Sequence, residues 1–260
     1  MHHSLRRTEI IRNILDITST DEQKGAATLV SFASTSKFLH LHAVDVLWHT
    51  LPNIKPLLNC MPSDIWREAP NVAQDFELQR PPRTEDWSRC NYYASRVRRL
   101  GYSRSSGPLD KDIWEGVSPR TMQTILEGGL SLPKLRYLCW HFSSRGADEV
   151  LLLDGFLRGL DLREFSFSTW RMSSEMFEVL AGLSKLHTLR LIGCTRDALD
   201  FAPITKPFPS LRHIALSVDT LPIATSFLSR LAGLPLESIE LSFGRLWTRL
   251  RRLTLISAQI

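Results

Sequence analysis

A short apolar motif recurs at a nearly constant interval through the second half of the chain. The pattern Leu-x-x-Leu-x-Leu, or a close variant, occurs as LRYLCW, LREFSF, LHTLRL, LRHIAL and LESIEL, which start at residues 135, 162, 186, 211 and 236. The offsets between these starts are 27, 24, 25 and 25 residues. Such a period indicates small supersecondary units, each of which must stack on its neighbours to bury its apolar face.

This period and motif are those of leucine-rich repeats, in which a short strand alternates with a return segment. An earlier strand is predicted at VRRLGY, from Val97. Helical return segments are expected over 147–157, 174–183 and 223–231. Three prolines between the third and fourth motifs argue against a helix there. The sequence thus predicts an α/β fold in which 97–260 form a short, irregular leucine-rich-repeat solenoid with a parallel sheet on its concave face.

Basic residues follow the first apolar residue of most motifs. The residues at this place are Arg98, Arg136, Arg163, His187, Arg212 and Glu237. A parallel sheet would align them, so Arg136, Arg163, His187 and Arg212 are candidate contacts for a protein substrate. An acidic partner is one interpretation. The other is an ordinary solvated face, since long basic side chains keep their charge in water.

The first fifty residues predict three short helices. Thr8 can cap the first, Thr20-Asp-Glu-Gln23 has the spacing of a capping box before the second, and Ser34-Thr35-Ser36 precede the third, which ends before Pro52. Three helices in about forty residues bury little surface, so apolar side chains left on the outside favour a partner.

These residues carry a resemblance to a known family. SLRRTEIIRNIL, followed by a Leu- and Ala-rich helix and SKFLHLHAVDVLWHTL, resembles an F-box, of the type abundant in mushroom-forming fungi. The likeness covers residues 4–51, and DWSRCNYYASRVRRL resembles the stretch that follows the F-box in that family. The family pattern Leu-x-x-Pro-Glu-Ile-Leu is kept at Leu5, Glu9 and Ile10, whereas Thr8 stands at the proline position.

The resemblance implies a function in protein degradation. It implies a Skp-type adaptor, which joins F-box proteins to a cullin-based ubiquitin ligase, and docking residues Leu5, Ile10, Ile14, Leu29, Leu47 and Trp48. The repeat surface would bind a protein substrate, and the chain itself would not be an enzyme. Two alternatives stay open. In a ligase-independent leucine-rich-repeat scaffold the same residues only pack the helices together, and a nucleic-acid binder would use the arginine ladder.

Composition and motifs argue against other classes. The sequence has no phosphate-binding glycine loop, no GxSxG and no HExxH, and its four cysteines are too scattered for a zinc site, so we predict no catalytic residue, metal or cofactor. A net charge of +5 leaves room for an acidic partner, but the basic residues are dispersed, so nucleic acid is not indicated. The absence of an apolar run of about 18 residues predicts a soluble cytoplasmic or nuclear protein without membrane contact.

Two further segments complete the prediction. Residues 52–96 are interrupted by prolines and predict a connector with one helix, opened by Thr84-Glu-Asp-Trp87, whereas 102–112 are expected to form a solvated loop. The strand-like LRRLTL begins at Leu250, only 14 residues after Leu236, which is too short for a full return segment. We therefore expect a shortened or irregular last repeat, with an exposed apolar edge that promotes self-association.

Overall fold

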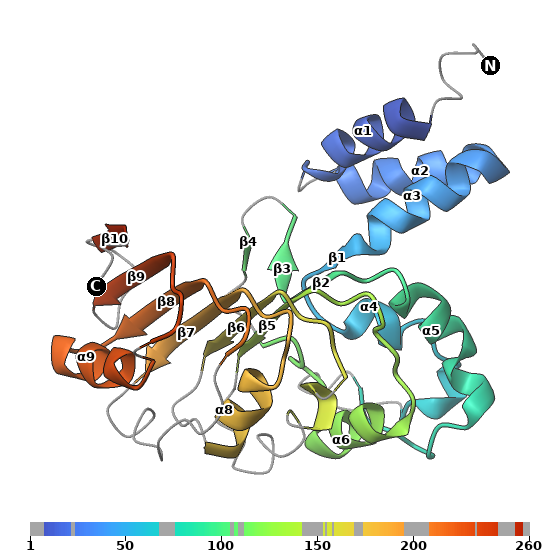
Figure 1. Ribbon diagram of the computed structural model, residues 1–260. Coiled ribbons are helices and arrows are strands. Elements are labelled where there is room, and N and C mark those ends of the chain that lie inside the picture. The colour runs from blue at the N-terminus through green and yellow to red at the C-terminus, as the bar shows by residue number, and fades with distance from the viewer. Residues whose placement is uncertain are drawn as a thin grey trace.

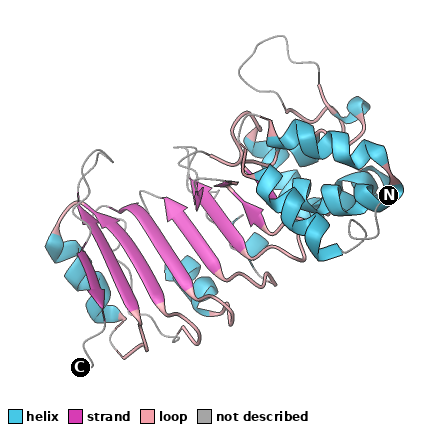
Figure 2. Ribbon diagram, turned by 90° about the horizontal axis from the view of Figure 1, so that it is seen from above, coloured by secondary structure: helices cyan, strands magenta, loops and turns pink. Residues whose placement is uncertain are grey.

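The chain forms an α/β structure in which three N-terminal helices precede a sheet (Figure 1). The computed structural model describes residues 8–21, 24–67, 76–104, 107–108, 112–141, 153, 155–157, 159–168, 174–194, 208–231, 233–243 and 253–256. Figure 2 shows the strands side by side in a row that leads away from the N-terminal helices.

The sheet follows the order of the chain. Within the described residues its eight strands run β1-β2-β5-β6-β7-β8-β9-β10. Their bounds are β1 (Thr50–Leu51), β2 (Arg99–Leu100), β5 (Tyr137–His141), β6 (Glu164–Ser168), β7 (Thr188–Cys194), β8 (His213–Val218), β9 (Ser238–Phe243) and β10 (Leu253–Ile256). Neighbours from β1 to β9 are parallel. The strands predicted at the five motifs and at VRRLGY are therefore confirmed.

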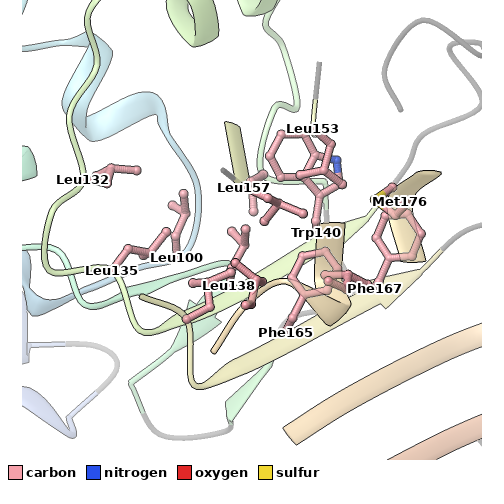
Figure 3. Packing of buried hydrophobic residues seen from close by; sticks show 14 of the residues in the cluster. Leu100, Leu132, Leu135, Leu138, Trp140, Leu153, Leu157, Phe165, Phe167 and Met176 are labelled. Atoms are coloured by element: carbon pink, nitrogen blue, oxygen red, sulfur yellow. The ribbon is translucent and has the colours of Figure 1, made fainter. Parts of the chain in front are cut away.

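One face of the sheet carries the core. Figure 3 shows Leu138 and Trp140 of β5 and Phe165 and Phe167 of β6 in the same cluster as Met176 from the helix beyond β6. All five side chains are buried, because alternate strand residues point to the same face. The motif's apolar positions thus do what the repeat pattern predicts, which is to build one continuous core.

Helices α6 (Pro119–Gly128), α8 (Ser174–Ala181) and α9 (Leu221–Arg230) lie on that face (Figure 1). The last two agree with predicted return helices. Helix α6 was not predicted, although the sequence signals it: the Ser118 hydroxyl accepts the Thr121 N–H at 3.2 Å, Pro119 opens the first turn and Gly129 has φ of 136°. In the predicted helix at 147–157 the described residues, 153 and 155–157, are helical. Pro203 and Pro207 lie outside the described residues, and Pro209 lies in a non-helical stretch, as expected.

Helices α1 (Thr8–Ser19), α2 (Gly25–Thr35) and α3 (Lys37–His49) form a unit with a small core of their own. Helix α3 starts as predicted, because the Ser36 hydroxyl accepts the N–H of Leu39 at 3.2 Å. The capping box predicted before α2 includes Gln23, which lies outside the described residues; within them the Asp21 carboxylate accepts the N–H of Lys24 at 3.0 Å. Helix α3 passes directly into β1, with no residue between them.

The connector shares the core of the sheet. It holds α4 (Lys55–Leu58) and α5 (Trp87–Ala94), together with the 3-10 turns Ser63–Ile65 and Thr84–Asp86. The predicted stripe of Trp87, Cys90, Ala94 and Val97 is buried. Buried apolar residues from Leu51 to Leu241 make one cluster, so within the described residues no separate core divides 52–96 from the repeats.

One expectation is corrected and another is met. The segment expected to be a solvated loop contains a hairpin, β3 (Tyr102–Ser103) and β4 (Gly107–Pro108), in which Tyr102 is 2% exposed. The last repeat is irregular, as expected, since β10 pairs with β9 in antiparallel register, from Leu253 opposite Leu241 to Ile256 opposite Ser238. An antiparallel pair needs no crossover, which is why the short spacing suffices.

Two glycines of this region give a matched test of the packing. Both Gly101 and Gly107 have positive φ, of 80° and 87°, but a Cβ on Gly101 would meet the backbone carbonyl oxygen of Cys139, whereas one on Gly107 meets nothing within 4 Å. We expect Gly107→Ala to cost about 1 kcal/mol of unfolding free energy for its backbone conformation, and Gly101→Ala about 2 kcal/mol more for the forced contact. Urea unfolding of the two variants measures this, and equal losses would contradict it.

Candidate functional site

Exposed large apolar side chains gather on the first three helices. In the described part of the chain they are Ile10, Ile14 and Ile17 of α1, Val30 of α2, and Phe38 and Leu41 of α3, with Tyr92 and Leu221 elsewhere. The three isoleucines of α1 are spaced i, i+4, i+7, so they form one stripe, of which Ile17 is 73% exposed. We call these six residues on α1–α3 the apolar surface.

The structure separates the predicted docking residues into two groups. Ile10 and Ile14 belong to the apolar surface, with 38% and 41% exposure. Leu29 is fully buried between the helices, and Leu47 packs on the same small core, so both fit the alternative of internal packing. The expectation that Leu29 contacts an adaptor is therefore corrected. Leu5 lies outside the described residues.

Trp48 joins the helices to the connector. Its ring stacks on Tyr93 of α5, with centroids 4.4 Å apart, and packs against the large core. Nearby, Arg96 Nε lies 2.8 Å from Asp45 Oδ1 and the Arg104 guanidinium donates to the Leu47 carbonyl. Trp48 is thus part of a junction, although it also lines, with Leu47, a mainly apolar cavity of about 520 Å³.

The basic ladder is aligned by backbone hydrogen bonds. The N–H of Arg136 donates to the carbonyl of Arg98 at 2.9 Å, and the N–H of Arg163 donates to the carbonyl of Arg136 at 2.7 Å. In the same way, the N–H of His187 donates to the carbonyl of Arg163 at 2.8 Å, and the N–H of Arg212 donates to the carbonyl of His187 at 2.9 Å. The four predicted contact residues therefore stand in one column with Arg98. The column lies directly before the strands, and its contact with a substrate stays a prediction.

The face of the sheet without helices is partly covered. Cys139 and Ser166, expected on the open face, are fully buried. Gly101 lies against Cys139, and the Tyr102 hydroxyl donates to Glu164 Oε1 at 3.1 Å. Glu164 also pairs with Arg190 at 2.9 Å, so the exposed charge on this face is already compensated at that point.

Cations concentrate at the start of the ladder. A cavity of about 490 Å³ is lined by His49, Arg98, Arg99, Lys134, Arg136, Tyr137 and Arg163, which we call the basic groove. An adjoining cavity of about 500 Å³ is also lined by His49, Arg98, Arg99 and Lys134, and it extends along α1 and α3. Sequence reasoning missed Arg99 and Lys134. The consecutive arginines of VRRLGY and the lysine directly before LRYLCW were the available signal, once the repeats are aligned.

The described residues include the buried thiols of Cys90 and Cys139. They include no group of three His, Cys, Asp or Glu side chains placed to hold a metal ion. Cys139 Sγ lies 3.2 Å from His141 Nε2, but both residues are buried within the sheet. Burial raises the pKa of Cys90 to about 12. No described helix has the length and apolar character needed to cross a membrane.

Comparison with known proteins adds no relative. None of the known protein-family models matches this chain. A search of curated proteins likewise finds no match.

The surroundings of His49 generate a prediction about pH. Burial, and then Arg98 and Arg99, lower the pKa of His49 below its usual 6.5, and Arg12 adds to this while Asp16 opposes it. Below about pH 6.5 the unfolded chain therefore binds a proton that the folded chain does not, so folding stability falls as the pH falls through that window. Urea unfolding between pH 7.5 and 5.5 should show a smaller loss for His49→Gln than for the unchanged protein. An identical pH dependence would contradict the assignment.

Proposed function

We propose that this chain is the substrate-recognition subunit of an SCF-type ubiquitin ligase. Helices α1–α3 act as an F-box that docks a Skp-type adaptor, and the adaptor connects the chain to a cullin. The repeats form a leucine-rich-repeat solenoid that binds a protein substrate. The observation that carries the proposal is the apolar surface on the same residues that resemble an F-box.

The apolar surface supports docking on physical grounds. In the described part of the chain the core of the three helices has Ile11, Leu15, Leu29 and Ala43 at its centre, while six large apolar side chains stay exposed on them. Fully burying a side chain of this size is worth about 1.5–3 kcal/mol. A partner that covers the stripe of Ile10, Ile14 and Ile17 on α1 would gain enough free energy to hold the complex together, since a contiguous exposed apolar stripe favours a protein partner.

The sheet supports the second half of the proposal. Its strand order follows the chain order, and the strands recur at the repeat period, as in a solenoid built by stacking. Solenoids present extended surfaces suited to proteins. The chain would contribute proximity and no bond chemistry, because a held substrate has a high effective concentration near the ubiquitin-carrying enzyme.

A ligase-independent scaffold is the second candidate. It is favoured by the packing of Leu29, Leu47 and Trp48 into the chain's own contacts, and by Thr8 at the usual proline position. In that case the apolar surface would contact some other protein, and a purified Skp-type adaptor would not bind.

Adaptor binding tests the proposal directly. We expect Ile10→Asp combined with Ile14→Asp to weaken binding of a purified Skp-type adaptor about 100-fold or more, because loss of each central apolar contact costs about 2 kcal/mol or more. Titration calorimetry measures the affinity. The matched control is Leu221→Asp, an exposed leucine of α9. We expect wild-type affinity for that control.

Two results would reject the assignment. One is a folded Ile10→Asp/Ile14→Asp variant, shown by circular dichroism, that binds the adaptor like the unchanged protein. The other is an unchanged protein that does not bind the adaptor at all, which would favour the scaffold.

A further inference from the structure

The basic groove contains closely spaced like charges, most of which have no counter-charge among the described residues. Arg98, Arg136 and Arg163 are held at adjacent positions by the backbone bonds of the ladder, and adjacent strands are about 4.8 Å apart. Lys134 lies two residues before Arg136 and lines the same groove. Like charges at this spacing repel one another, so the groove favours an anion that relieves the repulsion.

Ion pairs within the chain do little to neutralise the groove. In the described residues Arg98, Lys134 and Arg163 have no ion pair, and Arg136 approaches Asp161 only to 3.8 Å. Asp161 is committed more closely to Lys185, at 2.6 Å. Further along the ladder the situation changes, because Arg212 has Glu237 at 3.6 Å. The uncompensated charge is therefore confined to the end of the ladder beside α3.

Part of the groove is fixed in place before any ligand binds. The Arg99 guanidinium lies over the ring of Tyr137, 4.4 Å from its centroid, and 5.6 Å from that of Tyr102. A guanidinium stacked in this way keeps its N–H groups directed outward in one plane, which suits the two oxygens of a carboxylate. Little side-chain entropy is then lost when an anion binds.

From this groove we infer a binding site for a short acidic segment of a protein, in which Asp or Glu carboxylates pair with Arg98, Arg99, Arg136 and Arg163. The groove's lining contains cations, one histidine and one tyrosine, and no carboxylate. A space of about 490 Å³ accepts a few side chains of an extended peptide. As an anion site the groove stands on its own geometry. As the site for a ligase substrate it rests on the function proposed above.

Nucleic acid fits the same groove less well. Sequence-independent binding of single-stranded nucleic acid uses aromatic rings on which bases stack. Tyr137 is the aromatic residue of the groove, and Arg99 covers its ring. The adjoining cavity also brings in Asp16 and Asp45, which would repel a continuing phosphate backbone. A protein segment with a local cluster of carboxylates avoids that repulsion.

Fluorescence anisotropy of the purified full chain with a labelled peptide of eight glutamates tests the inference, with an eight-glutamine peptide as reference. We expect Arg98→Gln combined with Arg163→Gln to weaken binding of the glutamate peptide about tenfold or more, since two charge-assisted contacts are lost. The matched control is Arg89→Gln with Arg120→Gln, two exposed arginines of α5 and α6 with the same change in net charge. We expect less than a twofold change for the control.

Three outcomes would overturn the inference. They are equal binding of the glutamate and glutamine peptides, an equal loss in the control variant, and tighter binding of a single-stranded oligonucleotide of the same charge through the same two arginines. The Ile10→Asp/Ile14→Asp variant separates this site from the ligase role. In that variant we expect loss of adaptor binding with unchanged peptide binding. An unchanged protein that binds the glutamate peptide but not the adaptor would remove the ligase role and leave the groove, whereas adaptor binding without arginine-dependent peptide binding would remove the groove alone.

Discussion

The register between neighbouring parallel strands holds the sheet and its surfaces in place. It sets Leu100 opposite Leu138, then Phe165, Leu189 and Ile214 in turn, and all five are buried. A shift of one residue would move a strand's apolar set to the opposite face, so burial fixes the alignment strongly. The same register aligns the residues just before the strands. The closely spaced cations of the ladder are therefore a consequence of how the core is built, and charge repulsion among them is tolerated because the apolar column dominates.

The features that the sequence predicts well are those that depend on a local period. The strands at the five motifs, the buried stripe from Trp87 to Val97 and the cap at Ser36 all follow from spacing along the chain. What could not be predicted depends on neighbours distant in sequence. Nothing around Tyr102 indicates that it will be buried beside Glu164, 62 residues later, and nothing around Trp48 indicates that Tyr93 will cover it.

The candidate surfaces show the same division. Ile10 and Ile14 lie on one stripe of α1, as their spacing predicts, whereas the burial of Leu29 depends on how the three helices pack together. The ladder of basic residues could be predicted, because its members occupy the same position in successive repeats. The basic groove was not, because it also needs His49 at the end of α3 to lie beside the first strands of the sheet.

Helix α1 has three faces, of which one belongs to the apolar surface and another lies beside the basic groove. Ile10, Ile14 and Ile17 make the exposed apolar stripe, Ile11 and Leu15 face the helical core, and a polar stripe that includes Arg12 and Asp16 lines the cavity adjoining the basic groove. Partners on the apolar surface and in the basic groove would therefore contact different sides of α1.

The direct passage of α3 into β1 has a consequence for how this molecule tolerates change in length. Thr50 follows His49 without a loop, and β1 is fixed in the sheet by its pairing with β2. Since each residue of an α-helix turns it by about 100° and advances it by about 1.5 Å, one residue inserted near the end of α3 would swing the three helices around their axis relative to the sheet. Asp45 would leave Arg96, and the isoleucine stripe would point in a new direction. Substitutions at this junction alter individual contacts, but insertions and deletions would reorient the three N-terminal helices against the sheet.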